Sequence, residues 1–129
     1  MFEGLQLRHV PTLLFASLAA AGVLWPALDP RRALLEFGFP TRIANSPEAA
    51  PVMLVAQIRT TSIGIVMYAL YLQGKMDALD TILAVYGVLA GIVDGYAVWK
   101  QGDTKKALFR LVGSWSFAAY GLAGLTAGR

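Results

Sequence analysis

The chain has no cysteine, and its single histidine, His9, comes before the first long apolar stretch. The absence of cysteine excludes disulfides, thiolate metal sites and thiol redox chemistry. One histidine among scattered carboxylates is a poor ligand set for a transition metal. No nucleotide-binding motif is present either. We therefore expect no metal site and no redox cofactor.

Charge is also scarce. Charged residues are 15% of the sequence, against about a quarter in soluble domains. Hydrophobic residues make up 57% of the 129 residues, and the mean hydropathy is +0.57. The net charge is +3, but most of the basic residues lie in predicted loops, and they form no stripe for nucleic acid. These values indicate one domain in a lipid bilayer, with no nucleic acid as partner.

Four apolar stretches give the chain its organisation. We predict an all-α integral membrane protein, a four-helix antiparallel bundle with spans at residues 10–28, 52–72, 81–99 and 107–127. Each stretch is close to the roughly 20 residues that cross a bilayer. Pro26 should kink or loosen the end of the first span. The longest loop, residues 29–51, has an apolar part at residues 33–39 that is either a lid or a linker lying on the membrane surface.

Basic residues predict the orientation of these spans. An excess of lysine and arginine marks cytoplasmic loops. The loops at residues 29–51 and 100–106 carry most of them, so we expect these loops in the cytoplasm and both termini outside or in a lumen. The residues on the predicted cytoplasmic side are Arg31, Arg32, Arg42, Lys100, Lys105 and Lys106, and those on the other side are Arg8, Lys75 and Arg129.

Helical spacing predicts which faces meet protein. One face of the second span contains Gln57, Thr61, Gly64, Tyr68 and Tyr71. Arg59 points about 200° away from Gln57, so either a second face meets protein or Arg59 extends toward the nearer interface. The third and fourth spans carry glycines at helical spacing, which allow close approach of membrane helices. These glycine-rich faces could also support a homo-oligomer.

Asp94 is the only charged residue in residues 81–99, and an ionised group there costs about 2.5–3.5 kcal/mol on insertion scales. From the helical rise, Arg59, Asp94 and Arg110 lie about 10, 8 and 5 Å inside the same membrane face. Glu36 is on a loop at that end, and the opposite half of the bundle has no ionisable group. The layer is either a structural ion pair of Asp94 with Arg110 or Arg59, or a ligand site.

Part of this pattern resembles a known family. Arg59 followed by Gly64, then Val93-Asp94 late in the next span, and Gly102 before a last helix are similar to the four-helix membrane family called domain of unknown function 4267, of fungi and bacteria. The likeness covers residues 51–124 and extends more distantly to DoxX-like membrane proteins. Members often have a histidine early in the last helix, where this sequence has Arg110. The resemblance implies a multi-pass membrane protein, sometimes encoded among fungal secondary-metabolite genes, without a defined activity.

Two functions of different class fit these residues. The first is an isomerase or cyclase without redox cofactor that acts on a lipophilic small molecule. Asp94 would be its acid or base, and Arg59 or Arg110 would hold a carbonyl or oxyanion. The residues expected to contact the substrate are Gln57, Tyr68, Tyr96, Ser114 and Glu36.

The second function is non-enzymatic: a membrane scaffold, a transporter subunit or a lipid-binding protein in which the charged pair is structural. A partly apolar cavity that touches Asp94 would favour the enzyme. A close-packed interior would favour the scaffold.

Overall fold

The computed structural model describes residues 6–128, and every regular element in that range is helical, as predicted. The short elements are η1 (Leu7–His9), α2 (Leu24–Leu28), α3 (Pro30–Phe37) and α4 (Thr41–Ala44). The longer helices are α1 (Val10–Ala20), α5 (Ala49–Leu72), α6 (Met76–Lys100) and α7 (Thr104–Leu122).

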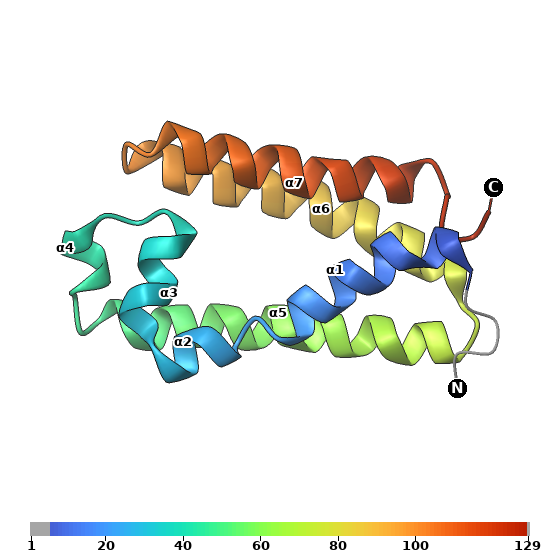
Figure 1. Ribbon diagram of the computed structural model, residues 1–129, viewed down its shortest axis with the longest axis horizontal. Helices are drawn as coiled ribbons and strands as arrows, with labels where there is room; N and C mark the ends of the chain where they lie inside the picture. The colour runs from blue at the N-terminus through green and yellow to red at the C-terminus, as the bar shows by residue number, and fades with distance from the viewer. Residues whose placement is uncertain (1–5, 129) are drawn as a thin grey trace.

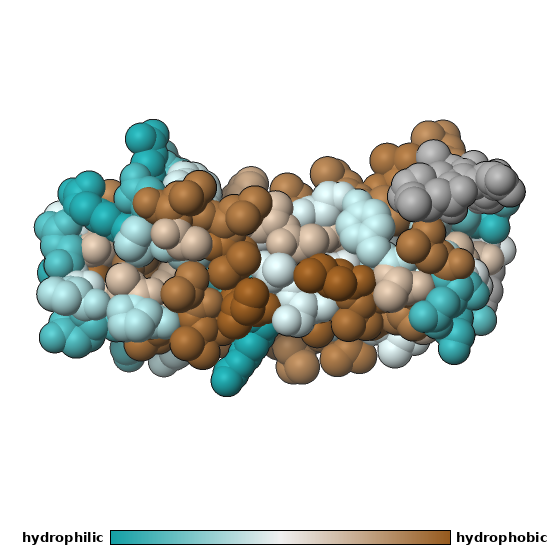
Figure 2. Space-filling model, turned by 90° about the horizontal axis from the view of Figure 1, so that it is seen from below, coloured by the Kyte–Doolittle hydropathy of each residue, from teal (hydrophilic) through white to brown (hydrophobic). Residues whose placement is uncertain are grey.

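Within the described residues, three helical segments are long and apolar enough to cross a membrane: Leu7–Leu28, Ala49–Leu72 and Met76–Lys100. Only 22% of each apolar window is buried inside the chain, so most of these side chains need an apolar solvent. Figure 2 shows mostly apolar residues across the middle of one long face, with one hydrophilic residue projecting at its edge, and most of the hydrophilic residues toward the two ends. The fourth predicted span corresponds to α7, which carries Lys105, Lys106 and Arg110 and is not among the three segments.

The long helices form two pairs, α6 with α7 and α1 with α5 (Figure 1). Tight turns at residues 73–75 and 101–103 join α5 to α6 and α6 to α7. At one end of the molecule, η1 and α1 lie beside the ends of α6 and α7. At the other end the two pairs are separated, and α2, α3 and α4 occupy that end. Asp94 and Arg110 lie between the two pairs.

Glycines allow the backbones of α6 and α7 to approach closely. A Cβ atom at Gly87 would lie 2.8 Å from the carbonyl oxygen of Ser114, and one at Gly91 would lie 2.7 Å from Cδ1 of Trp115. From α7, Gly121 lies against the backbone of Asp80 in the same way. The predicted small-residue faces are therefore used for contacts within the chain.

The predicted protein-facing side of the second span is confirmed, because it is the surface of α5 that packs on α1. Gly64 lies against the backbone of Ala16, where a Cβ would come within 2.6 Å of the carbonyl oxygen. Tyr68 hydrogen-bonds to Ser17 through its hydroxyl. The Tyr71 hydroxyl lies 3.0 Å from Nδ1 of His9.

The first predicted span is interrupted. Residues 21–23 form a turn between α1 and α2, one turn before Pro26. Proline has no N–H and its ring clashes with the carbonyl four residues earlier, so its effect falls on residue 22. The free N–H of Val23 donates to Oγ1 of Thr61 on α5 at 3.1 Å. A side chain of α5 thus supplies the hydrogen-bond acceptor that the Val23 N–H lacks within its own interrupted helix.

The predicted long loop contains two short helices. Asp29 caps α3 by accepting from the N–H of Arg32 at 3.2 Å, and Pro30 occupies the first helical position, where no N–H is needed. Gly38 ends α3 with φ +122°, a conformation that favours glycine. Leu34 is 3% exposed, so this segment packs on the rest of the chain.

We expect Gly64→Ala to lower the free energy of unfolding by about 1–3 kcal/mol, because the new methyl group would overlap backbone atoms of α1 that cannot move away. Thermal unfolding of the purified protein in detergent measures the change. Gly113→Ala is the matched control, since a Cβ there meets nothing within 4 Å. It should keep or raise stability, as alanine favours helix by about 1 kcal/mol. Equal destabilisation by both changes would contradict the close α1–α5 contact.

Candidate site at Asp94 and Arg110

A central cavity of about 330 Å³ lies between the two helix pairs and beneath α3. Residues from α1, α3, α5, α6 and α7 line it, so it forms only in the folded chain. Its hydrophobic lining includes Phe15, Phe37 and Phe117. Its polar lining consists of Gln57, Thr60, Tyr86, Asp94, Arg110 and Ser114.

Asp94 is half-buried in α6 and borders three cavities of the described structure. These are the central cavity, one of about 280 Å³ under α3, and one of about 650 Å³ along α6. Within residues 6–128 the structure records neither a hydrogen bond to the Asp94 carboxylate nor an ion pair of 4 Å or shorter. Its electrostatic partner is Arg110. The carboxylate therefore faces cavity space rather than a closed ion pair.

Arg110 joins α7 to the end of α3. Its guanidinium carbon lies 3.4 Å from the centre of the Phe37 ring, a cation–π contact. Its Nε donates to the carbonyl oxygen of Phe37 at 3.0 Å. The other guanidinium N–H groups are further donors, and Arg110 borders the central cavity together with Asp94. A donor group and a carboxylate therefore face the same space.

The segment at residues 33–39 covers this site. Nζ of Lys106 donates to the carbonyl oxygen of Leu35 at 2.8 Å, and Arg110 uses the carbonyl of Phe37. The last carbonyls of a helix carry partial negative charge, so they stabilise two cations of α7; the Leu35 carbonyl also accepts from the N–H of Gly38 at 3.1 Å. Gly38 sits so close to Val98 that a Cβ would lie 2.5 Å from Cγ1. The segment therefore packs on α6 and α7 and does not lie free on the surface, and whether it opens as a lid stays a prediction.

Two further polar residues complete the cavity wall. The hydroxyls of Thr60 on α5 and Tyr86 on α6 lie 2.9 Å apart and hydrogen-bond across the two helix pairs. The Tyr86 ring packs edge-on against Phe15, with centroids 5.8 Å apart, and Phe15 packs on Phe117 at 5.0 Å. These aromatic contacts close the cavity on the side away from α3.

Four of the predicted site residues come together: Asp94, Arg110, Gln57 and Ser114 all border the central cavity. Arg59 does not join them. It is exposed on the outer side of α5 and borders none of the three cavities that reach Asp94. Arg59 is exposed because it lies about 200° around the helix from Gln57, and the face of α5 that carries Gln57 meets protein. The predicted layer of three charges is therefore a pair.

Three other predicted contact residues also lie away from the central cavity. Glu36 is on the exposed side of α3, opposite the buried residues Ala33 and Leu34. Tyr68 is engaged with Ser17 at the α1–α5 contact. Tyr96 borders a different groove, on the outer side of α6 and α7.

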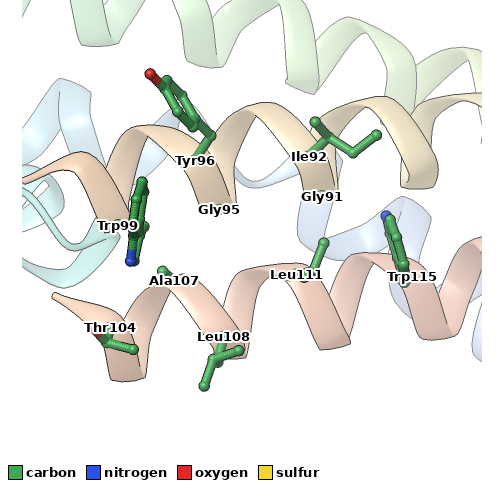
Figure 3. Close-up of a pocket in the computed structure, with 10 residues that line it drawn as sticks. All are labelled: Gly91, Ile92, Gly95, Tyr96, Trp99, Thr104, Ala107, Leu108, Leu111 and Trp115. Atoms are coloured by element: carbon green, nitrogen blue, oxygen red, sulfur yellow. The ribbon is translucent and has the colours of Figure 1, made fainter.

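That outer groove has a volume of about 460 Å³ and is shown in Figure 3. Ile92, Tyr96 and Trp99 come from α6, and Leu108, Leu111 and Trp115 come from α7. Gly91 and Gly95 line it where the two helices are close. The groove contains no ionisable side chain except the phenol of Tyr96, so it lacks the chemistry of the central cavity.

The opposite end of the bundle also holds a buried carboxylate, contrary to the prediction that this half has no ionisable group. Asp80 lies inside α6, which begins earlier than the predicted span, and it is 0% exposed. Its two carboxylate oxygens accept the N–H groups of Thr126 at 3.0 Å and Ala127 at 2.8 Å. His9 is buried at the same end. Asp80 thus fastens the segment after α7 to α6.

Sequence reasoning missed Tyr86, Thr60 and Ala90 as cavity residues. Ala90 and Tyr86 lie one and two turns before Asp94, and Thr60 lies one turn after Gln57, so helical spacing from the predicted residues could have found them. Among the described residues, no group of three or more histidine, cysteine, aspartate or glutamate side chains could hold a metal ion.

Comparison with known proteins gives one match. The family model described as "Domain of unknown function (DUF4267)" matches residues 16–126. That range includes all residues of the central cavity except Phe15. No curated protein and no solved structure matches the chain.

We expect Asp80→Asn to be a stability variant. The amide nitrogen cannot accept a hydrogen bond, so one of the two buried N–H groups loses its partner, at a cost of about 1–3 kcal/mol. Thermal unfolding in detergent should show the loss, and Glu36→Gln, at an exposed position, should leave stability unchanged. An Asp80→Asn protein as stable as the parent would show that this carboxylate does not hold the chain end.

Proposed function

This chain belongs to the DUF4267 family, a domain of unknown function, and we propose that it is a membrane-embedded isomerase or cyclase that acts by acid–base catalysis at Asp94. Its substrate would be a lipophilic small molecule of secondary-metabolite type. The observation that carries the proposal is that Asp94 borders cavities which it shares with Arg110, Gln57 and Ser114. No redox cofactor is needed for such chemistry.

The size and lining of the central cavity support a small-molecule ligand. About 330 Å³ lies in the range of ligand pockets, roughly 300–1,000 Å³, which are mostly apolar with a few placed polar groups. Phe15, Phe37 and Phe117 would contact an apolar skeleton. Gln57 and Ser114 would orient it through hydrogen bonds. A scaffold that used Asp94 and Arg110 only as a clamp would be expected to close their ion pair.

The chemistry follows from the two charged groups. Asp94 would remove a proton from the carbon that lies between a carbonyl group and a carbon–carbon double bond, and the C–H electron pair would form a new carbon–carbon double bond as the carbonyl π pair moves to oxygen. Arg110 N–H groups would stabilise this dienolate oxyanion, since donors fixed beforehand in a low-dielectric site act strongly. Asp94 would then return the proton to the far carbon of the dienolate, so the double bond moves into conjugation with the carbonyl group. Substrate and product have the same composition, so no co-reactant is required.

The same proposal includes the four-helix antiparallel membrane bundle, with α7 as the fourth span. At 19 residues α7 is about 28 Å long, close to the thickness of a hydrocarbon core. Lys105 and Lys106 lie in its first turn, where lysine side chains can extend to the interface. Arg110 is turned toward α3 and Asp94 rather than lipid. Both loops next to the site, at residues 29–51 and 100–106, would be cytoplasmic, and both termini outside or lumenal.

We expect Asp94→Asn to stay folded but to lose turnover by about 10²–10⁴, the usual effect of removing a positioned proton-transfer group. Lipid-soluble extracts of cells that produce either protein would be compared by liquid chromatography and mass spectrometry. An isomerase changes the retention time of a compound without changing its mass, and the converted species should be absent with Asp94→Asn.

Arg59→Gln is the matched control for this experiment, because it removes an exposed charge on the neighbouring span. It should retain full conversion. Thermal unfolding in detergent should place Asp94→Asn close to the parent protein, since the carboxylate has no hydrogen bond within residues 6–128 to lose. Full conversion by a folded Asp94→Asn protein would defeat the catalytic role. Loss of folding in step with loss of conversion would indicate a structural clamp instead.

The topology can be tested separately by cysteine labelling. Because the chain has no cysteine of its own, only the introduced thiol can react. In Lys105→Cys the introduced thiol should react with a membrane-impermeant maleimide only from the cytoplasmic side. The turn at the other end of α6 supplies the control, because Lys75→Cys should react only from the opposite side. Reversed reactivity would overturn the orientation, and reaction of both from one side would show that α6 does not cross the membrane.

A further inference from the structure

The largest cavity at Asp94 is a long groove along α6. Its volume is about 650 Å³, and it is lined by α6 residues between Thr81 and Asp94, with Ile63 from α5. At 1.5 Å per residue the groove runs for about 20 Å along the helix axis. It lies where α5 and α6 leave space between them. One of its ends is the carboxylate on which the proposed chemistry depends.

The groove is apolar along its length and open toward lipid. Apart from Thr81, Tyr86 and Asp94, its lining side chains are aliphatic. Val85, Leu89 and Val93 in this lining are 56%, 58% and 61% exposed. In a membrane these exposed flanks face acyl chains, so an apolar molecule could enter sideways from the bilayer without crossing water.

The groove adjoins the central cavity. Tyr86, Ala90 and Asp94 border both spaces, so a ligand with its head beside Asp94 could extend its chain along α6. On the other side of Asp94, α3 covers the site, and the space beneath it is the smaller cavity of about 280 Å³. The groove along α6, at about 650 Å³, is the larger space for a chain.

We propose that the site takes a linear lipophile, with its hydrocarbon chain in the α5–α6 groove and its oxygenated head at Asp94 and Arg110. The inference rests on the proposed function for the head position and adds the substrate class and the route of entry. Arg110 N–H groups that are not bonded to Phe37 fit a carbonyl oxygen. Asp94 fits the adjacent hydroxyl or acidic C–H group. The aliphatic lining from Ile82 to Leu89 fits a methylene or prenyl chain.

Photo-crosslinking tests this placement in the full chain. The probes are two long-chain methyl ketones, each with an alkyne handle, and with a diazirine either near the ketone or near the far end of the chain. After irradiation in liposomes, mass spectrometry identifies the labelled peptides. We expect the first probe to label α6 and α7 around Asp94 and Arg110, and the second to label Ile63 and residues 81–85.

Two tryptophan substitutions make the test specific. Val85 lines the groove and not the central cavity. Val85→Trp should reduce labelling by the far-end probe about tenfold, because the indole ring would occupy space that the chain needs. Val112→Trp is the control, because Val112 is 61% exposed on α7 and borders none of the cavities at Asp94. It should leave labelling unchanged.

The outcomes separate this inference from the proposed function. In one outcome the first probe labels residues near Asp94, but the far-end probe labels Trp99 and Trp115 of the outer groove or is spread over all lipid-facing residues. This result would overturn the groove as the binding site of the chain and would leave the proposed catalytic site standing. Equal labelling of Val85→Trp and the parent by the far-end probe would also overturn the groove. Failure of the first probe to label residues around Asp94 would defeat both.

Discussion

The close contact between α6 and α7 is the constraint on which the other features of the site depend. Lipid solvates apolar side chains as well as protein does, so membrane helices associate mainly through tight van der Waals packing. Gly87 and Gly91 bring α6 against α7 along this seam. Asp94, which follows Gly91 by three residues, then lies at the edge of the seam and not within it. Its carboxylate is directed beside Arg110, toward the space that separates the two helix pairs.

A second consequence concerns how Arg110 is neutralised. In a closed ion pair, Arg110 and Asp94 would neutralise each other. The cavity would then lose Arg110 as a hydrogen-bond donor and Asp94 as an acceptor. Instead the end of α3 shares the guanidinium through the ring and carbonyl of Phe37. Lys106 repeats the arrangement at Leu35. The partial negative charge at the end of a helix thus stabilises cations of α7 and leaves Asp94 open to a ligand.

The sequence was sufficient for the helical class, for the α5 face that meets protein, and for the similar depth of Asp94 and Arg110, but it left open whether Arg59 or Arg110 is the neighbour of Asp94. The length of an apolar stretch and the helical spacing of its residues are local properties, so both can be read directly from the sequence. It was not sufficient for Arg59, since a guanidinium at that depth can either pair inside or extend outward, and the packing of α1 decides between them. The docking of α3 through Phe37 and the burial of Asp80 by residues 126–127 depend on contacts between distant segments, which no periodicity shows.

Asp80 and Asp94 lie on one helix, and the difference between them is the reason to place the proposed chemistry at Asp94. Moving either group out of water has a similar cost. For Asp80 two backbone N–H groups inside the chain offset part of that cost, so a structural role accounts for this carboxylate. For Asp94 the compensation comes from the charge of Arg110 and from whatever occupies the cavity. A bound substrate would be converted faster if Asp94 interacted more strongly with its transition state than with its ground state. Of the two carboxylates, only Asp94 is placed to provide this difference.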